Sequence, residues 1–117
     1  MKVSRIQELL EARFLTGEAF RDRVVWSAGG GELVDDILRA AAKDAVLLTG
    51  LATIEVVRRS VAVGVGCLVF VRGKRVGQDI VDLASANDLP LLSTSWPLFV
   101  ACGHLYMNGL RGFEESW

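Results

Sequence analysis

The sequence has few cysteines and almost no net charge, and each scarcity excludes a class of protein. Two cysteines among 117 residues are too few for a disulfide framework, so we expect both thiols to be reduced. Thirteen basic and 14 acidic side chains give a formal net charge of −1, which provides no positive field to hold a nucleic-acid backbone. We therefore expect no nucleic-acid partner.

Long hydrophobic runs are missing as well. The longest apolar stretch, Val61 to Val71, is interrupted by Gly64 and Gly66 and falls short of the about 20 residues that span a membrane. The first ten residues lack the apolar core of a secretory signal. The sequence thus predicts a cytoplasmic protein without a membrane partner.

Apolar residues are plentiful at 51% of the chain, which excludes intrinsic disorder and suffices for a buried core. No linker or low-complexity segment divides the sequence, so we expect one domain over residues 1–117. A mean hydropathy of +0.37 in so short a chain indicates apolar surface that is covered in an oligomer, and we expect a homodimer.

Short apolar runs recur at nearly constant spacing and predict strands. They are apolar on successive residues, which is typical of strands buried on both faces of a parallel sheet. The runs are Val24–Trp26, Val46–Leu48, Leu68–Val71 and Leu91–Leu92. We expect Trp26 to lie in the core.

Segments of helical period separate these runs, at residues 32–42, 53–63 and 77–87. Further helices are expected at 3–10 and 97–109, an edge strand at 12–17 and an irregular tail at 111–117. Strands that alternate with helices predict a three-layer α/β/α sandwich with a mostly parallel sheet.

Small, hydroxyl-bearing or cationic residues follow each predicted strand. The carboxyl ends of parallel strands meet at one edge of a sheet, where ligands tend to bind. We therefore expect a small anionic or nucleotide-like ligand there. The candidate ligand-binding residues are Ser27, Gly29, Gly30, Thr49, Gly50, Arg72, Gly73, Lys74, Ser93 and Thr94.

Two glycine-containing segments at this edge have alternative interpretations. Gly29 to Gly31 precede a predicted helix, so their N–H groups either cradle an anion or form a flexible turn. Gly73-Lys74 is similar to the end of a Walker A motif, but Arg75 replaces the hydroxyl residue that binds magnesium. A phosphate-transferring P-loop is excluded, and the cations either attract an acidic ligand or are solvated.

Cys102 and His104 are residues of metal-ligand type. They supply at most half of a tetrahedral shell, and on a helix residues two apart point to different sides. A metal or cluster site therefore needs two chains, and the alternative is packing on an apolar helix. No cofactor is expected. His104 is the single histidine, so general acid–base catalysis has little support and we expect no enzyme.

Four segments in order give the chain a resemblance to the DRTGG domain family, over roughly residues 20–110. The segments are Val46-Leu47-Leu48-Thr49-Gly50-Leu51, Val69-Phe70-Val71-Arg72-Gly73-Lys74, Asp88-Leu89-Pro90-Leu91-Leu92-Ser93-Thr94 and Ala101-Cys102-Gly103-His104-Leu105-Tyr106-Met107-Asn108-Gly109-Leu110. Thr49-Gly50 matches the Thr-Gly of the family motif, and Leu51 replaces its second glycine.

The resemblance implies a fold like the N-terminal domain of HPr kinase/phosphorylase, and a regulatory role without catalytic residues. It also implies a hydrogenase or kinase-signalling context. Two hypotheses follow: a regulatory sensor of a small ligand, or a protein-interaction module of a hydrogenase or kinase system. A metal or cluster protein that uses Cys102 and His104 across a dimer is a further alternative.

Overall fold

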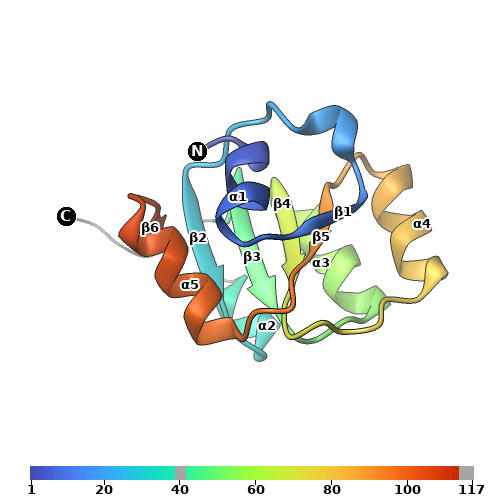
Figure 1. Ribbon diagram of the computed structural model, residues 1–117. Helices are drawn as coiled ribbons and strands as arrows, with labels where there is room; N and C mark the ends of the chain where they lie inside the picture. Colours follow the sequence, from blue (N-terminus) through green and yellow to red (C-terminus); the bar gives the residue numbers. More distant parts are fainter. Residues whose placement is uncertain (39–41, 114–117) are drawn as a thin grey trace.

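The structure, a computed structural model, describes residues 1–38 and 42–113, and its elements alternate as the sequence predicts (Figure 1). They are α1 (Val3–Leu9), β1 (Arg13–Thr16), the 3-10 helix η1 (Glu18–Phe20), β2 (Ser27–Gly30), α2 (Val34–Ile37), β3 (Ala45–Thr49), α3 (Ile54–Val63), β4 (Cys67–Phe70), α4 (Gln78–Ala86), β5 (Leu91–Ser93), α5 (Leu98–Met107) and β6 (Arg111–Gly112).

Within this part of the chain the strands form one six-stranded sheet in the order β1-β5-β4-β3-β2-β6. Neighbouring strands from β5 through β6 are parallel, and β1 pairs antiparallel with β5. The sheet is therefore mostly parallel, as predicted, and the predicted edge strand at 12–17 is confirmed as β1.

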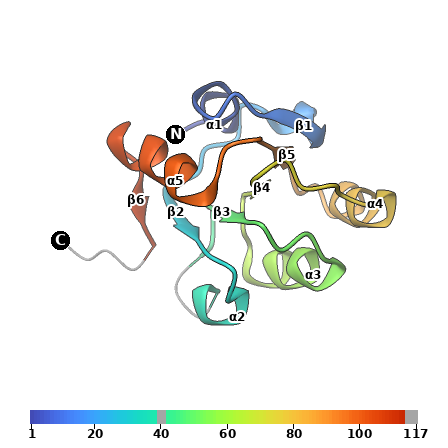
Figure 2. The same cartoon turned by 60° about the horizontal axis from the view of Figure 1, so that its bottom comes forward.

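Helices cover both faces of the sheet (Figure 2). Helices α1 and α5 lie on one face, and α2, α3 and α4 lie on the other. Successive strand residues alternate between the two cores: Val46 and Leu48 pack with α1 and α5, whereas Leu47 packs with α3. The predicted three-layer α/β/α fold is confirmed.

Strand β2 begins three residues later than the apolar run Val24–Trp26 predicts. The apolar run Val24–Trp26 precedes β2, and Trp26 is 73% exposed, so its predicted place in the core is wrong. The strand is formed by the small residues Ser27–Gly30, predicted as a loop, because neighbouring side chains leave no room for larger ones. A Cβ on Gly29 would lie 2.1 Å from the Phe113 ring, and one on Gly30 would lie 2.6 Å from the Cys102 sulfur.

The α2 region and the carboxyl end of the chain differ from expectation. The helix predicted over residues 32–42 spans Val34–Ile37, and residues 39–41 lie outside the described part. The tail was expected to be irregular from residue 111, but Arg111–Gly112 forms β6 and extends the sheet beside β2. Residues 114–117 also lie outside the described part.

The remaining helices agree with the periodicity of the sequence. Thr53 caps α3 by accepting a hydrogen bond from the Val56 N–H at 3.3 Å, and Gly64 ends it with φ of 82°. No helix in residues 1–38 or 42–113 is long and apolar enough to cross a membrane.

Candidate functional site

The carboxyl ends of β2, β3, β4 and β5 share one edge of the sheet, because these four strands are parallel. The predicted site residues lie along this edge but in separate surroundings. Thr49 and Gly50 end β3, Gly73 and Lys74 follow β4, and Ser93 ends β5.

Thr49 is fully buried, and its hydroxyl is engaged within the protein. Its Oγ1 donates to a Glu32 carboxylate oxygen at 3.4 Å and accepts from the Leu51 N–H at 3.1 Å. A Cβ on Gly50 would lie 2.7 Å from the other Glu32 oxygen. The carboxylate thus fills the space beside Thr49 and Gly50, where an anionic ligand would meet repulsion.

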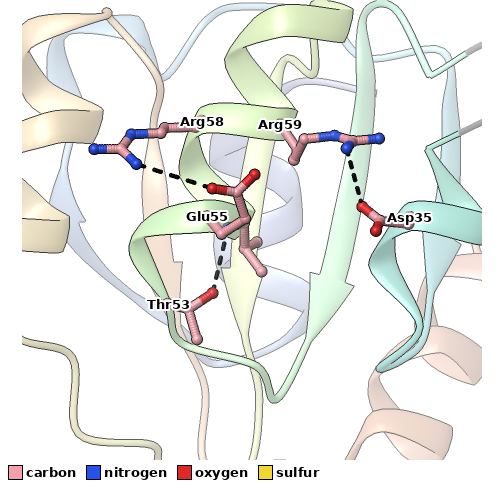
Figure 3. A network of polar contacts seen from close by, with 6 residues as sticks. Asp35, Thr53, Glu55, Arg58 and Arg59 are labelled. Carbon is pink, nitrogen blue, oxygen red and sulfur yellow. Dashed lines mark hydrogen bonds and ion pairs between the residues drawn. The ribbon is translucent and has the colours of Figure 1, made fainter.

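A pocket of about 260 Å³ opens beside this carboxylate, between α2 and α3. Its wall carries three acids, Glu32, Asp35 and Glu55, and one cation, Arg59. Arg59 pairs with Asp35 at 3.3 Å, and Glu55 pairs with Arg58 at 3.9 Å (Figure 3). The acids outnumber the cation, so this pocket disfavours anions.

Thr94 is also part of the framework of the edge. The side chain is 2% exposed; its Oγ1 donates to the Leu10 carbonyl at 2.7 Å and accepts from the Trp96 N–H at 3.2 Å. The hydroxyl therefore joins the end of β5 to the end of α1. Its predicted contact with a ligand stays a prediction.

A second pocket, of about 280 Å³, brings three of the predicted residues together. It is lined by Gly73, Lys74 and Ser93, and by three residues outside the predicted set: Glu11, Arg13 and Ser95. Arg13 reaches this pocket because β1 runs antiparallel to β5 and places Arg13 opposite Ser93. The sequence predicts an edge strand that contains Arg13, but it does not show in which direction this strand runs or which strand it pairs with.

The loop that carries Lys74 is fixed to the β5–α5 connection. The Arg72 N–H donates to the Trp96 carbonyl at 2.8 Å, and the Gly73 N–H donates to the Thr94 carbonyl at 2.9 Å. Arg72 and Gly73 have φ of 62° and 61°, a left-handed turn that folds the loop over the strand end. Exposed Arg72 and Arg75 flank Lys74 in this loop.

The pocket can bind an anion through two cations of different geometry. Arg13 offers a planar fork of donors and Lys74 a mobile ammonium, beside the hydroxyls of Ser93 and Ser95. Glu11 offsets one positive charge and leaves the lining with a formal excess of one. A phosphate or carboxylate group has the matching charge.

Ser27, Gly29 and Gly30 lie apart from that pocket, in β2. The predicted glycine loop before a helix is wrong, since these residues form strand hydrogen bonds with β3. Gly29 and Gly30 line a different pocket of about 340 Å³ with Cys102, Tyr106 and other residues. The Arg111 guanidinium lies 4.7 Å from the Tyr106 ring centroid at this pocket.

Cys102 and His104 point to different sides of α5, as helix geometry predicts. The Cys102 sulfur lies against Gly30 of β2, and burial raises the pKa of its thiol. The His104 ring packs on Trp96 with a centroid distance of 4.4 Å. Residues 1–38 and 42–113 hold no cluster of three or more His, Cys, Asp or Glu side chains suited to a metal.

Comparison with known proteins identifies a related fold. No protein-family model and no curated protein matches the chain. Among solved structures, the chain is similar to the crystal structure of the CBS and DRTGG domains of the regulatory region of Clostridium perfringens pyrophosphatase, complexed with the activator diadenosine tetraphosphate. The TM-score is 0.73 at 15% identity, over 89% of this chain and 45% of that chain.

This similarity supports a DRTGG-like fold. The chain spans less than half the length of the matched structure. That structure is a pyrophosphatase regulatory region, so the expected likeness to the HPr kinase N-terminal domain stays a prediction.

Proposed function

We propose that this protein is a non-enzymatic regulatory domain that binds a small anionic, nucleotide-like ligand at the strand-end pocket beside Lys74. The observation that carries the proposal is the meeting of Arg13 and Lys74 next to Ser93. These cations lie 61 residues apart in the sequence and meet at the edge where open parallel sheets bind ligands. The related fold occurs in a regulatory region that was crystallised with a nucleotide activator.

The residues have distinct roles in this proposal. Arg13 and Lys74 bind the phosphate groups, with Ser93 and Ser95 as hydroxyl partners. Gly73 leaves space for the ligand, because the nearest protein atom would lie 4.0 Å from a Cβ built there. The backbone φ of 61° also favours glycine at this position.

Other predicted residues shape the edge in this proposal. Arg72 adds positive charge at the rim, and Thr94 holds the loops. Thr49 and Gly50 lie beside Glu32, which lines the neighbouring acidic pocket. Ser27, Gly29 and Gly30 act through the packing of β2 and not by contact with the ligand.

Isothermal titration calorimetry tests the proposal with diadenosine tetraphosphate, ATP and inorganic pyrophosphate as probes. Lys74→Ala removes a cation from the pocket, and Lys43→Ala is the matched control, since Lys43 is exposed and precedes the amino end of β3. We expect Lys74→Ala and Arg13→Ala each to weaken binding by about tenfold or more, the loss of a charged hydrogen bond.

Binding should also weaken as salt is added. The absence of binding by all three probes, or equal affinities of Lys74→Ala and Lys43→Ala, would refute the proposed site.

A further inference from the structure

Helix α5 has an apolar surface on both its inner and its outer side. Its ten residues include no Asp, Glu, Lys or Arg. Ala101 and Leu105 face the sheet and are buried. The outer side carries exposed apolar residues: Phe99 is 88% exposed, and Met107 is 85% exposed. A helix that is apolar all round is normally covered on every side, so we expect a partner to cover the outer face of α5.

Gly103 lies at the centre of this outer face, and no packing contact within the subunit requires a glycine there. Among the described residues, no atom lies within 4 Å of a Cβ built on Gly103. Glycine also destabilises a helix interior relative to alanine. The missing side chain therefore serves nothing within one subunit, whereas it allows a second backbone to approach closely.

The exposed apolar residues are arranged symmetrically about Gly103. Phe99 and Met107 stand four residues before and after it, and Val100 and Tyr106 stand three residues before and after it. We call these four side chains together with Gly103 the α5 face. Val100 is 40% exposed and Tyr106 46% exposed. Such symmetry suits an isologous interface, in which the same patch meets itself across a two-fold axis.

We propose that the α5 face binds a second copy of this chain, with the two α5 helices antiparallel and crossing at Gly103. This arrangement brings Phe99 of each copy against Met107 of the other, and Val100 against Tyr106. The two-fold axis brings no like charges together on the helix, because α5 carries no Asp, Glu, Lys or Arg.

The available apolar surface is of the right order for a dimer. An aromatic side chain buries about 150–250 Å² when covered, and a standard interface buries about 800 Å² on each partner. Phe99, Met107 and the 73% exposed Trp26 supply much of that area. Trp26 shares a pocket wall with Asn108, Gly109 and Leu110, directly after α5, and so lies near the carboxyl end of the α5 face.

Sedimentation velocity of the full chain at micromolar concentration tests the interface. Wild type should be a dimer, and Gly103→Glu should be monomeric, because a bulky charge at the crossing point repels its own copy. Ala62→Glu is the matched control, an exposed alanine on the outer side of α3, and should remain a dimer. Gly103→Glu should keep the wild-type circular dichroism spectrum, since its site is open within the subunit. A monomeric wild type, or a Gly103→Glu dimer, would overturn the proposal.

Disulfide trapping tests the orientation of the helices. In a Cys102→Ala background, Phe99→Cys and Met107→Cys proteins are oxidised separately and as an equimolar mixture. Antiparallel helices predict a cross-linked heterodimer in the mixture and little cross-linking of either protein alone. Cross-linking of each protein with itself, without a cross-linked heterodimer in the mixture, would instead show parallel helices and contradict the antiparallel arrangement.

Discussion

Cys67 is fully buried in β4, and this burial raises the pKa of its thiol from 9.0 to about 12, while the charge of Arg23 lowers it in part. Below pH 9 the thiol is protonated in both the folded and the unfolded chain, so it adds no pH dependence. Between pH 9 and about 12 the unfolded chain loses the proton and the folded chain keeps it. The thiol therefore lowers the free energy of unfolding as pH rises through this range.

Urea unfolding at pH 7 and pH 10, with a reducing agent present, measures this effect. From pH 7 to pH 10 we expect the free energy of unfolding of wild type to fall by about 1.4 kcal/mol more than that of Cys67→Ala. The reason is that pH 10 lies one unit above the pKa of 9.0 in the unfolded chain, and one pKa unit corresponds to about 1.4 kcal/mol. Cys102→Ala is the control. Its free energy of unfolding should fall between pH 7 and pH 10 by nearly as much as that of wild type, because Cys102 is only half-buried. Equal losses in wild type and Cys67→Ala would show that the Cys67 thiol ionises freely in the folded protein.

At the scale of elements, the Thr94 hydroxyl joins the end of β5 to the end of α1 and to the following loop. Thr94→Val keeps the shape of the side chain but leaves the buried Leu10 carbonyl without this donor. We expect the free energy of unfolding to fall by about 1–3 kcal/mol, the cost of a buried polar group without a partner. Urea denaturation measures it, with Thr16→Val on the half-exposed edge strand as control.

The same variant separates a framework role from ligand contact. If Thr94 only positions the loops, the folded fraction of Thr94→Val should bind the nucleotide probes with an affinity much closer to wild type than Lys74→Ala does. A stable Thr94→Val protein with lost binding would place the hydroxyl in direct contact with the ligand.

The strands that consist of bulky apolar residues could be predicted from the sequence. The runs at β3, β4 and β5 are buried on both faces, and their composition is typical of parallel strands. The small residues of β2 carry no such signal, because the space beside Gly29 and Gly30 is filled by Phe113 and Cys102 from much later in the chain. The candidate pocket was half predicted for a similar reason: Lys74 and Ser93 follow strands, whereas Arg13 joins them through an antiparallel pairing.

At the scale of the whole molecule, the central strands connect the two cores. Leu47 packs on the side of α3, whereas its neighbour Leu48 packs on the side of α1 and α5, and both are fully buried. Neither core can lose its strands while the other keeps them. We therefore expect the two faces of the sheet to unfold in one cooperative transition.

Leu47→Ala and Leu48→Ala provide the test, since each should lower the free energy of unfolding by about 2–5 kcal/mol. Trp96 packs against the core that contains Leu48, so its fluorescence reports on that face when Trp26 and Trp117 are replaced by Phe. In the Leu47→Ala protein, Trp96 fluorescence and far-ultraviolet circular dichroism should shift to the same lower urea midpoint. A Trp96 transition that stays at the wild-type midpoint would mean that the core on the α1 and α5 side is stable on its own.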